Sequence, residues 1–137
     1  MNNRYATRIE VPGTTIRYYN LSKKMFIPKA FAGESELINL SKSGACFYVN
    51  ERLSFGEKLT MKFFFPDGNV FKLAGHVRWV KEAVSSISYN VGVLFSPFGI
   101  GKGYNPPSAL DYFKKVHKLD KIVIEKNTDD QQPEEIN

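Results

Sequence analysis

Two short groups of polar residues near the start of the chain have the side chains and spacing needed to hold an anion or a nucleobase. The first is Arg4 and Arg8, in a segment that precedes the first predicted strand. A guanidinium group can donate two parallel hydrogen bonds to guanine, pair with a phosphate or stack flat on a purine. Residues four apart share one side of a helical turn, and from an extended arm both can curl around one ligand. Paired N-terminal arginines are also often only solvated, so they do not define a site alone.

The second group, Asn39-x-Ser41-x-x-Gly44, lies where a predicted strand ends in a turn. We interpret Asn39 as able to meet the Watson–Crick edge of a guanine, and Ser41 as able to meet a base or phosphate oxygen. Gly44 would let the backbone turn sharply and let a ligand come close. An ordinary serine-containing hairpin turn that ends in glycine explains the same residues without a ligand.

The elements that must position these groups are mostly strands. Short segments rich in β-branched and aromatic residues alternate with turns. The six predicted strands are Thr14–Tyr19, Glu36–Leu40, Ala45–Val49, Lys58–Phe65, Asn69–Val80 and Ser86–Phe95. Turn residues at Ser41–Gly44 and Pro66–Gly68 connect two of the strand pairs. This spacing predicts a mainly β fold, an antiparallel barrel or sandwich.

One helix is predicted after the strands, over Ser108–His117. Ser108 is its expected N-cap, and Asp111 is the acid expected in its first turn. Its apolar face is wide enough to cover the open end of a barrel. Lys121–Ile124 predicts one last strand or an extended packing segment.

Two longer stretches lack a regular pattern, and they help to divide the chain. Leu21–Gly33 is interpreted as a basic, apolar surface loop or a bulged continuation of the first strand, and Ser96–Pro107 as a loop. We expect an N-terminal ligand-binding arm over 1–13, a barrel with its helix over 14–126, and an acidic disordered tail over 127–137.

The two polar groups, in this order, resemble the two halves of the ligand site in bacterial PilZ domains. That family's pattern is Arg-x-x-x-Arg, a first strand, and then Asp/Asn-x-Ser-x-x-Gly. The matching residues are Arg4, Arg8, Asn39, Ser41 and Gly44. Gly75–Trp79 and Tyr89–Phe95 resemble the family's later strands, so the resemblance runs from about Arg4 to His117. It implies a six-stranded antiparallel PilZ-type β-barrel with a C-terminal α-helix.

The resemblance also implies a ligand, cyclic di-GMP, gripped between the arm and the barrel. We therefore interpret the chain as a stand-alone cyclic di-GMP receptor that passes the second-messenger level to an effector protein, with outputs in motility, polysaccharide or biofilm control. Many members carry another arginine where this chain has Asn3, which leaves open whether one or two ligands bind. Trp79 is either a core residue or a stacking wall for a guanine, and we favour the core.

Composition bounds these interpretations. The net charge is +5. The last eleven residues contain four acidic side chains and no Lys or Arg, so the positive charge lies in the folded body. Such a body implies an anionic partner. No apolar run approaches the roughly 20 residues of a membrane span, and the polar N-terminus with a single cysteine, Cys46, indicates a cytoplasmic protein. His76, His117 and Cys46 lack metal-ligand spacing, so we expect neither a metal or cofactor nor catalysis.

Two alternatives from other classes stay open. The first is an adaptor of the same fold that binds proteins and no nucleotide. The second, less favoured, is a small barrel that binds single-stranded nucleic acid through basic and aromatic residues such as Phe63, Phe64 and Phe65. Consecutive residues of a strand face opposite sides, so these three rings cannot all form one stacking platform.

Overall fold

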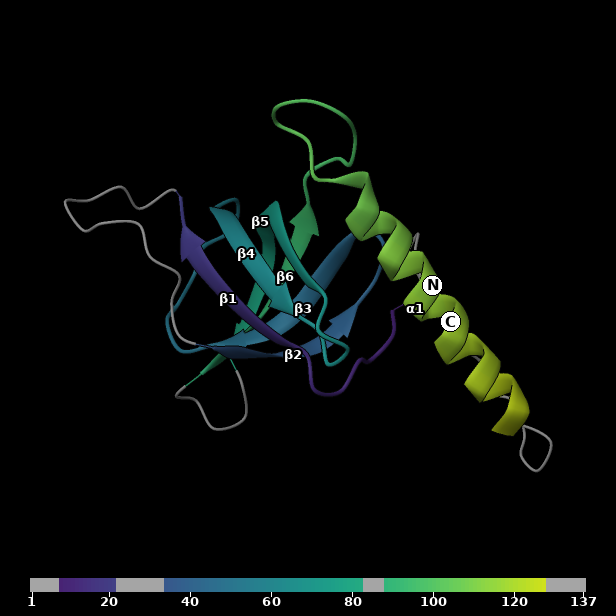
Figure 1. The fold of residues 1–137 in the computed structure, drawn as a ribbon. Coiled ribbons are helices and arrows are strands. Elements are labelled where there is room, and N and C mark those ends of the chain that lie inside the picture. The colour runs from purple at the N-terminus through teal and green to yellow at the C-terminus, as the bar shows by residue number, and fades with distance from the viewer. Residues whose placement is uncertain (1–7, 22–33, 83–87, 128–137) are drawn as a thin grey trace, which may run out of the picture.

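Six strands and one helix make up the described part of the chain (Figure 1). This computed structural model describes residues 8–21, 34–82 and 88–127, with the helix side chains described as far as residue 117. The elements are β1 (Thr15–Asn20), β2 (Ser35–Leu40), β3 (Gly44–Val49), β4 (Lys58–Phe64), β5 (Val70–Glu82), β6 (Tyr89–Phe95) and α1 (Pro107–Asn127). The strands close into a barrel in the order β1-β2-β3-β6-β5-β4, and all neighbours are antiparallel. The predicted mainly β fold with a C-terminal helix is confirmed, and it is a barrel rather than a sandwich.

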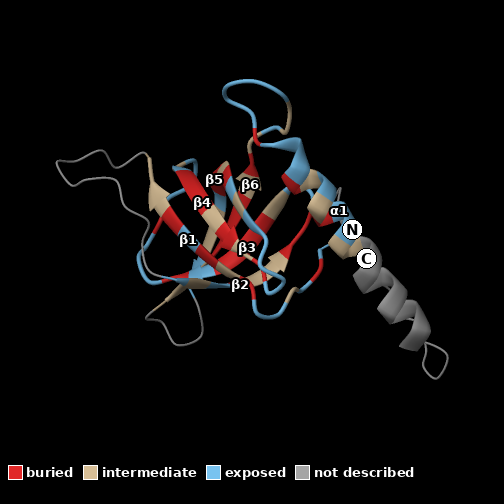
Figure 2. Ribbon diagram, viewed as in Figure 1, coloured by how far each residue is buried: buried red, intermediate tan, exposed pale blue. Residues whose placement is uncertain are grey.

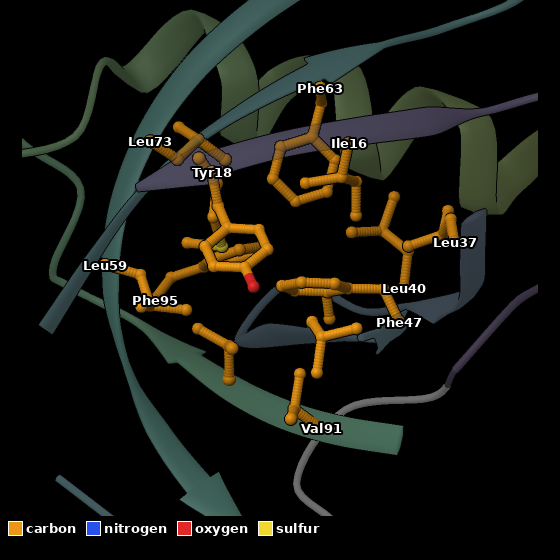
Figure 3. Close-up of a cluster of buried hydrophobic side chains, with 14 of the residues drawn as sticks. Ile16, Tyr18, Leu37, Leu40, Phe47, Leu59, Phe63, Leu73, Val91 and Phe95 are labelled. Carbon is orange, nitrogen blue, oxygen red and sulfur yellow. The ribbon is translucent and has the colours of Figure 1, made fainter. Parts of the chain in front are cut away.

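Apolar side chains from alternate strand positions fill the interior of the barrel (Figure 3). Figure 2 shows buried residues on all of the strands that surround it. In β4, Leu59, Met61 and Phe63 are fully buried, each contributing about 1.5–3 kcal/mol by leaving water. Tyr18 and Phe47 meet in the same core with ring centroids 6.0 Å apart. Phe63 and its neighbour Phe65 are therefore core residues, and they are not available to stack on nucleic acid bases.

Helix α1 covers one end of the barrel through an aromatic cluster. Phe113 is buried, and its ring centroid lies within 6.4 Å of five rings from the barrel and the loop before α1: Phe63, Phe65, Phe71, Phe95 and Phe98. The Tyr112 hydroxyl donates a hydrogen bond of 2.6 Å to Asp67 in the turn between β4 and β5. Packing and this hydrogen bond together fasten the helix, which confirms its expected role as a lid.

The helix begins earlier and ends later than the sequence predicts. It begins at Pro107, a residue suited to the first helical position because its missing N–H has no partner there anyway. Ser108 therefore lies inside the helix instead of capping it, and Asp111 is not in the first turn. The strand or extended segment predicted at Lys121–Ile124 is wrong, because these residues continue α1, whose far end extends beyond the barrel in Figure 1.

Register shifts interrupt two of the strands. In β2 the shift falls between Leu37 and Asn39, and in β5 it falls between Val77 and Trp79. Such a β-bulge inserts one extra residue and changes which side chains beyond it face inward. Both shifts lie next to residues of the candidate site.

The remaining expectations are confirmed in part. The predicted strands agree with β1 to β5 to within two residues at each end, and β6 begins at Tyr89. The stretch from Ser96 to the start of α1 is a loop, apart from one isolated bridge between Phe98 and Asn105. The arm before residue 8, the segment 22–33, residues 83–87 and the tail 128–137 lie outside the described residues. Within the described ranges, α1 is not apolar enough over its length to cross a membrane.

Candidate functional site

The turn between β2 and β3 is built around the hydroxyl of Ser41. Its Oγ accepts hydrogen bonds from the backbone N–H groups of Ser43 and Gly44, each 3.2 Å long, and the backbone N–H of Ser41 donates to the Gly44 carbonyl at 2.9 Å. Ser41 is nearly buried. Its side chain therefore closes the turn, as in other turns where a serine bonds its own backbone.

Gly44 serves the barrel in a way that the sequence does not reveal. It has no positive φ, so a sharp left-handed turn is not the reason for a glycine here. A Cβ at this position would lie 2.1 Å from the backbone oxygen of Val93 on β6. Gly44 thus allows β3 to approach β6 closely, and its predicted clearance for a ligand is a separate matter that stays a prediction.

The described end of the N-terminal arm lies beside the same turn. The backbone N–H and C=O of Ile9 exchange two hydrogen bonds with Leu40, each 2.8 Å long. Ile9 is buried with Leu40, and adjacent residues of an extended chain point to opposite sides, so Arg8 is placed on the outer side next to Ser41. Arg8 is exposed. Arg4 lies outside the described residues, so the structure does not place the two arginines relative to each other.

A row of four directly paired residues crosses the outer face of the barrel from this point. Asn39 on β2 pairs with Cys46 on β3, Cys46 pairs with Gly92 on β6, and Gly92 pairs with Trp79 on β5. Directly paired residues share one face of a sheet. Their neighbours Leu40, Ala45, Val91 and Val93 are core residues, which places the row outside.

Trp79 reaches this outer face because of the bulge in β5. Val77 points inward opposite Val93, and after the extra residue the inward position is taken by Val80 opposite Val91. Trp79 instead lies across Gly92, where a Cβ would be 2.2 Å from the indole nitrogen. The prediction that Trp79 packs in the core is therefore wrong. It is a partly exposed aromatic on the outer face, in the same row as Asn39.

The groups around this row are polar or cationic at one end and aromatic at the other. Within the described part of the chain, the Asn39 side-chain amide forms no hydrogen bond. Burial raises the pKa of the Cys46 thiol, and the positive charge of Arg8 acts on it in the opposite direction. Arg8 thus lies near enough to project its charge onto the middle of the row. The thiol is neutral at pH 7, and Cys46 is the residue that β3 contributes to the row.

Nothing in the described ranges indicates a catalytic or metal centre. No group of three or more His, Cys, Asp or Glu side chains there is arranged to hold a metal ion. His76 lies on the outer face of β5, where it pairs with Lys58 and Leu94. The candidate site thus consists of a side-chain amide, a cation and an aromatic ring on one outer face.

A closed six-stranded antiparallel barrel, with a helix over one end and an arm beside the β2–β3 turn, defines a class of small β-barrel domain. Comparison with models of protein families identifies the family within this class. The PilZ domain matches residues 4–100, and the chain belongs to the PilZ family. A comparison with curated proteins gave no significant match.

Two solved structures share the fold. The Bacillus subtilis inhibitor of motility, MotI/DgrA, superposes with a TM-score of 0.59 at 17% identity, over 88% of this chain and 54% of that one. YcgR from Escherichia coli, in a complex with c-di-GMP, superposes with a TM-score of 0.65 at 15% identity, over 90% of this chain and 48% of that one. This chain therefore spans about half the length of each.

Three contributors to the site were missed by sequence reasoning. Ile9 is an apolar residue between two charged ones in the arm, and that pattern signals an inward-facing side chain. Cys46 and Gly92 enter the site only through cross-strand pairing, which no local pattern specifies. The bulge that brings Trp79 beside Gly92 has no sequence signal either.

Proposed function

We propose that this protein is a receptor for cyclic di-GMP. The observation that carries the proposal is the outer-face row from Asn39 to Trp79, with Arg8 at its Asn39 end. The row offers an amide for a base edge, a cation for phosphate or guanine, and an aromatic face for stacking. The PilZ match and the c-di-GMP complex of YcgR support the choice of ligand.

Each proposed site residue has a distinct role. Arg8, together with Arg4, clamps the phosphates and a guanine, and Asn39 pairs with a base edge. Trp79 provides a wall against which a guanine stacks. Ser41 closes the turn and so fixes the backbone on which the ligand rests. Gly44 keeps that turn close to β6 and leaves room above it.

The proposed output is a change at the arm that an effector protein reads. A ligand held by both arginines would order the arm against the barrel, and the new surface would recruit or release the effector. The superposition on an inhibitor of motility supports motility as one candidate output. Control of polysaccharide or biofilm is the other.

Isothermal titration calorimetry with cyclic di-GMP tests this proposal, with GMP and cyclic di-AMP as controls. We expect saturable binding of cyclic di-GMP alone, and a molar ratio that distinguishes one bound ligand from two. Arg8→Ala should weaken binding at least about tenfold, because a charge-assisted bidentate contact is lost. Arg17→Ala is the matched control, since Arg17 is an exposed arginine on β1, which lies across the barrel from β6.

Equal affinity in the wild type and Arg8→Ala would refute the proposed clamp. A flat titration with folded wild-type protein would refute the receptor proposal altogether. The remaining candidate would then be the adaptor of the same fold.

A further inference from the structure

Ile9 joins the arm to the barrel at one pair of residues. Its two backbone hydrogen bonds to Leu40 form an isolated bridge, with no other arm residue paired to β2 in the described part of the chain. The side chain is 7% exposed, and Leu40 is 1% exposed. A buried apolar side chain and two hydrogen bonds hold this point in place, and we call the Ile9–Leu40 pair the latch.

Both residues of the latch are next in sequence to residues of the candidate site. On β2, Leu40 lies between Asn39 and Ser41, and on the arm Ile9 follows Arg8. Because neighbouring residues of an extended chain face opposite sides, an inward Ile9 requires an outward Arg8. The positive charge of Arg8 acts to lower the pKa of Cys46, in the middle of the row, so Arg8 lies near this residue.

A second attachment fixes the arm beyond the latch. The N–H of Thr14 donates to the Val11 carbonyl at 3.2 Å, which closes a turn in which Gly13 has a φ of +88°. A Cβ on Gly13 would lie 3.3 Å from Pro66 in the β4–β5 turn, so these two turns lie close together. The chain from Ile9 to β1 is thus held at both ends.

We propose that Ile9 is a positioning residue for the cyclic di-GMP site. The latch holds Arg8 outward beside Asn39 and Ser41 before the ligand arrives. A guanidinium whose backbone is already fixed loses less conformational freedom on binding, and binding is tighter for that reason. This inference rests on the proposed function and adds a residue that never touches the ligand.

A double-mutant cycle separates this role from general stability. Ile9→Ala should raise the dissociation constant for cyclic di-GMP about tenfold, and Ile9→Val, which keeps a β-branched apolar side chain, should restore it to within about twofold. In an Arg8→Ala background, Ile9→Ala should change affinity by less than about twofold, because the guanidinium next to Ile9, which the latch positions, is absent. Leu53→Ala is the control: Leu53 is 1% exposed in the β3–β4 connection, at the other end of the barrel from the Ser41–Gly44 turn.

The outcomes are distinct. Unchanged affinity in a folded Ile9→Ala protein, an equal loss in Leu53→Ala, or an undiminished effect in the Arg8→Ala background would each overturn the inference while leaving the receptor proposal intact. A wild type that binds no cyclic di-GMP would overturn the receptor proposal and this inference together.

Hydrogen exchange tests the latch without any variant, in case Ile9→Ala does not fold. The Leu40 amide donates to Ile9, so it should be protected from exchange in the ligand-free wild type. Exchange of this amide at the rate of an open chain would show that the latch is not closed before binding, and would overturn the inference.

Discussion

At the scale of single residues, the pairing of Trp79 with Gly92 determines where the indole lies on the outer face. The three atoms nearest to a hypothetical Cβ on Gly92 all belong to the Trp79 indole, at 2.2 to 2.8 Å. The missing side chain therefore creates the place in which the ring lies. Trp79 is also the only tryptophan of the chain, so its fluorescence reports on this place alone.

Gly92→Ala should push the indole away from β6. We expect a loss of about 1–3 kcal/mol of unfolding free energy from overpacking, with a shift in the Trp79 emission and weaker binding of cyclic di-GMP. Denaturant titrations followed by fluorescence and circular dichroism measure the first two effects. In a Trp79→Ala background the same substitution should cost little, because the space is empty. An equal cost in both backgrounds would mean that the indole does not occupy this place.

Some residues of the candidate site could be predicted from the sequence, and others could not. Arg8, Asn39, Ser41 and Gly44 could be selected by type and spacing, and the structure places all four around one turn. The face of Trp79 could not be predicted, because strict alternation from Val77 puts Trp79 inside and only the bulge puts it outside. For Gly44, local sequence suggests a turn, whereas the close approach of β6 is a tertiary effect.

At the scale of elements, the hydrogen bond from Tyr112 to Asp67 connects α1 to the β4–β5 turn. This hydrogen bond holds the pKa of the Asp67 carboxyl below its usual value. Burial and the same hydrogen bond raise the pKa of Tyr112 to about 12. The bond is at full strength only when the carboxyl is ionised and the phenol is neutral.

The stability that Tyr112 adds should therefore depend on pH. A lowered carboxyl pKa stabilises the fold above the unfolded value of about 4, and this contribution is lost as the pH falls through the folded value. A raised phenol pKa stabilises the fold below the unfolded value of about 10, and this contribution is lost as the pH rises towards 12.

Tyr112→Phe keeps the ring against Phe65 and Phe71 and removes only the hydroxyl. Thermal melts should show the variant less stable than the wild type at pH 7, with the difference shrinking below pH 4 and above pH 10. Tyr104→Phe, an exposed tyrosine in the loop before α1, should show no such difference. A gap between wild type and Tyr112→Phe that is constant with pH would contradict this account of the hydrogen bond.

The prediction for Lys121–Ile124 was wrong because the local preference of these residues conflicts with the continuation of α1 through them. Ile122, Val123 and Ile124 favour a strand locally, which is why an extended segment was predicted. No Gly or Pro interrupts the chain from Ser108 to Asn127, and each further helical residue adds a hydrogen bond without a new nucleus. The helix therefore continues through them. The strands were predicted well because most have one buried and one exposed face.

At the scale of the whole molecule, a basic body could attract many anions, and salt dependence distinguishes among them. A ligand with two phosphates displaces few counterions, so its affinity should fall only modestly between about 50 and 200 mM salt. An oligonucleotide that contacts several phosphates should lose affinity by orders of magnitude over the same range. Calorimetric titrations at both salt concentrations make the comparison. A steep salt dependence for cyclic di-GMP would indicate binding to diffuse positive charge rather than to the site described.

A nuclear magnetic resonance titration of ¹⁵N-labelled protein with cyclic di-GMP would locate the ligand on the barrel, and we propose that it lies on the outer face between Arg8 and Trp79. We expect saturable shifts in the backbone amides of Arg8, Asn39 and the Ser41–Gly44 turn, and in the indole N–H of Trp79, which gives a single resolved signal. The Leu53 amide, in the connection at the other end of the barrel, should stay unchanged. Absence of shifts, or shifts confined to the Leu53 end, would refute binding of cyclic di-GMP at this face.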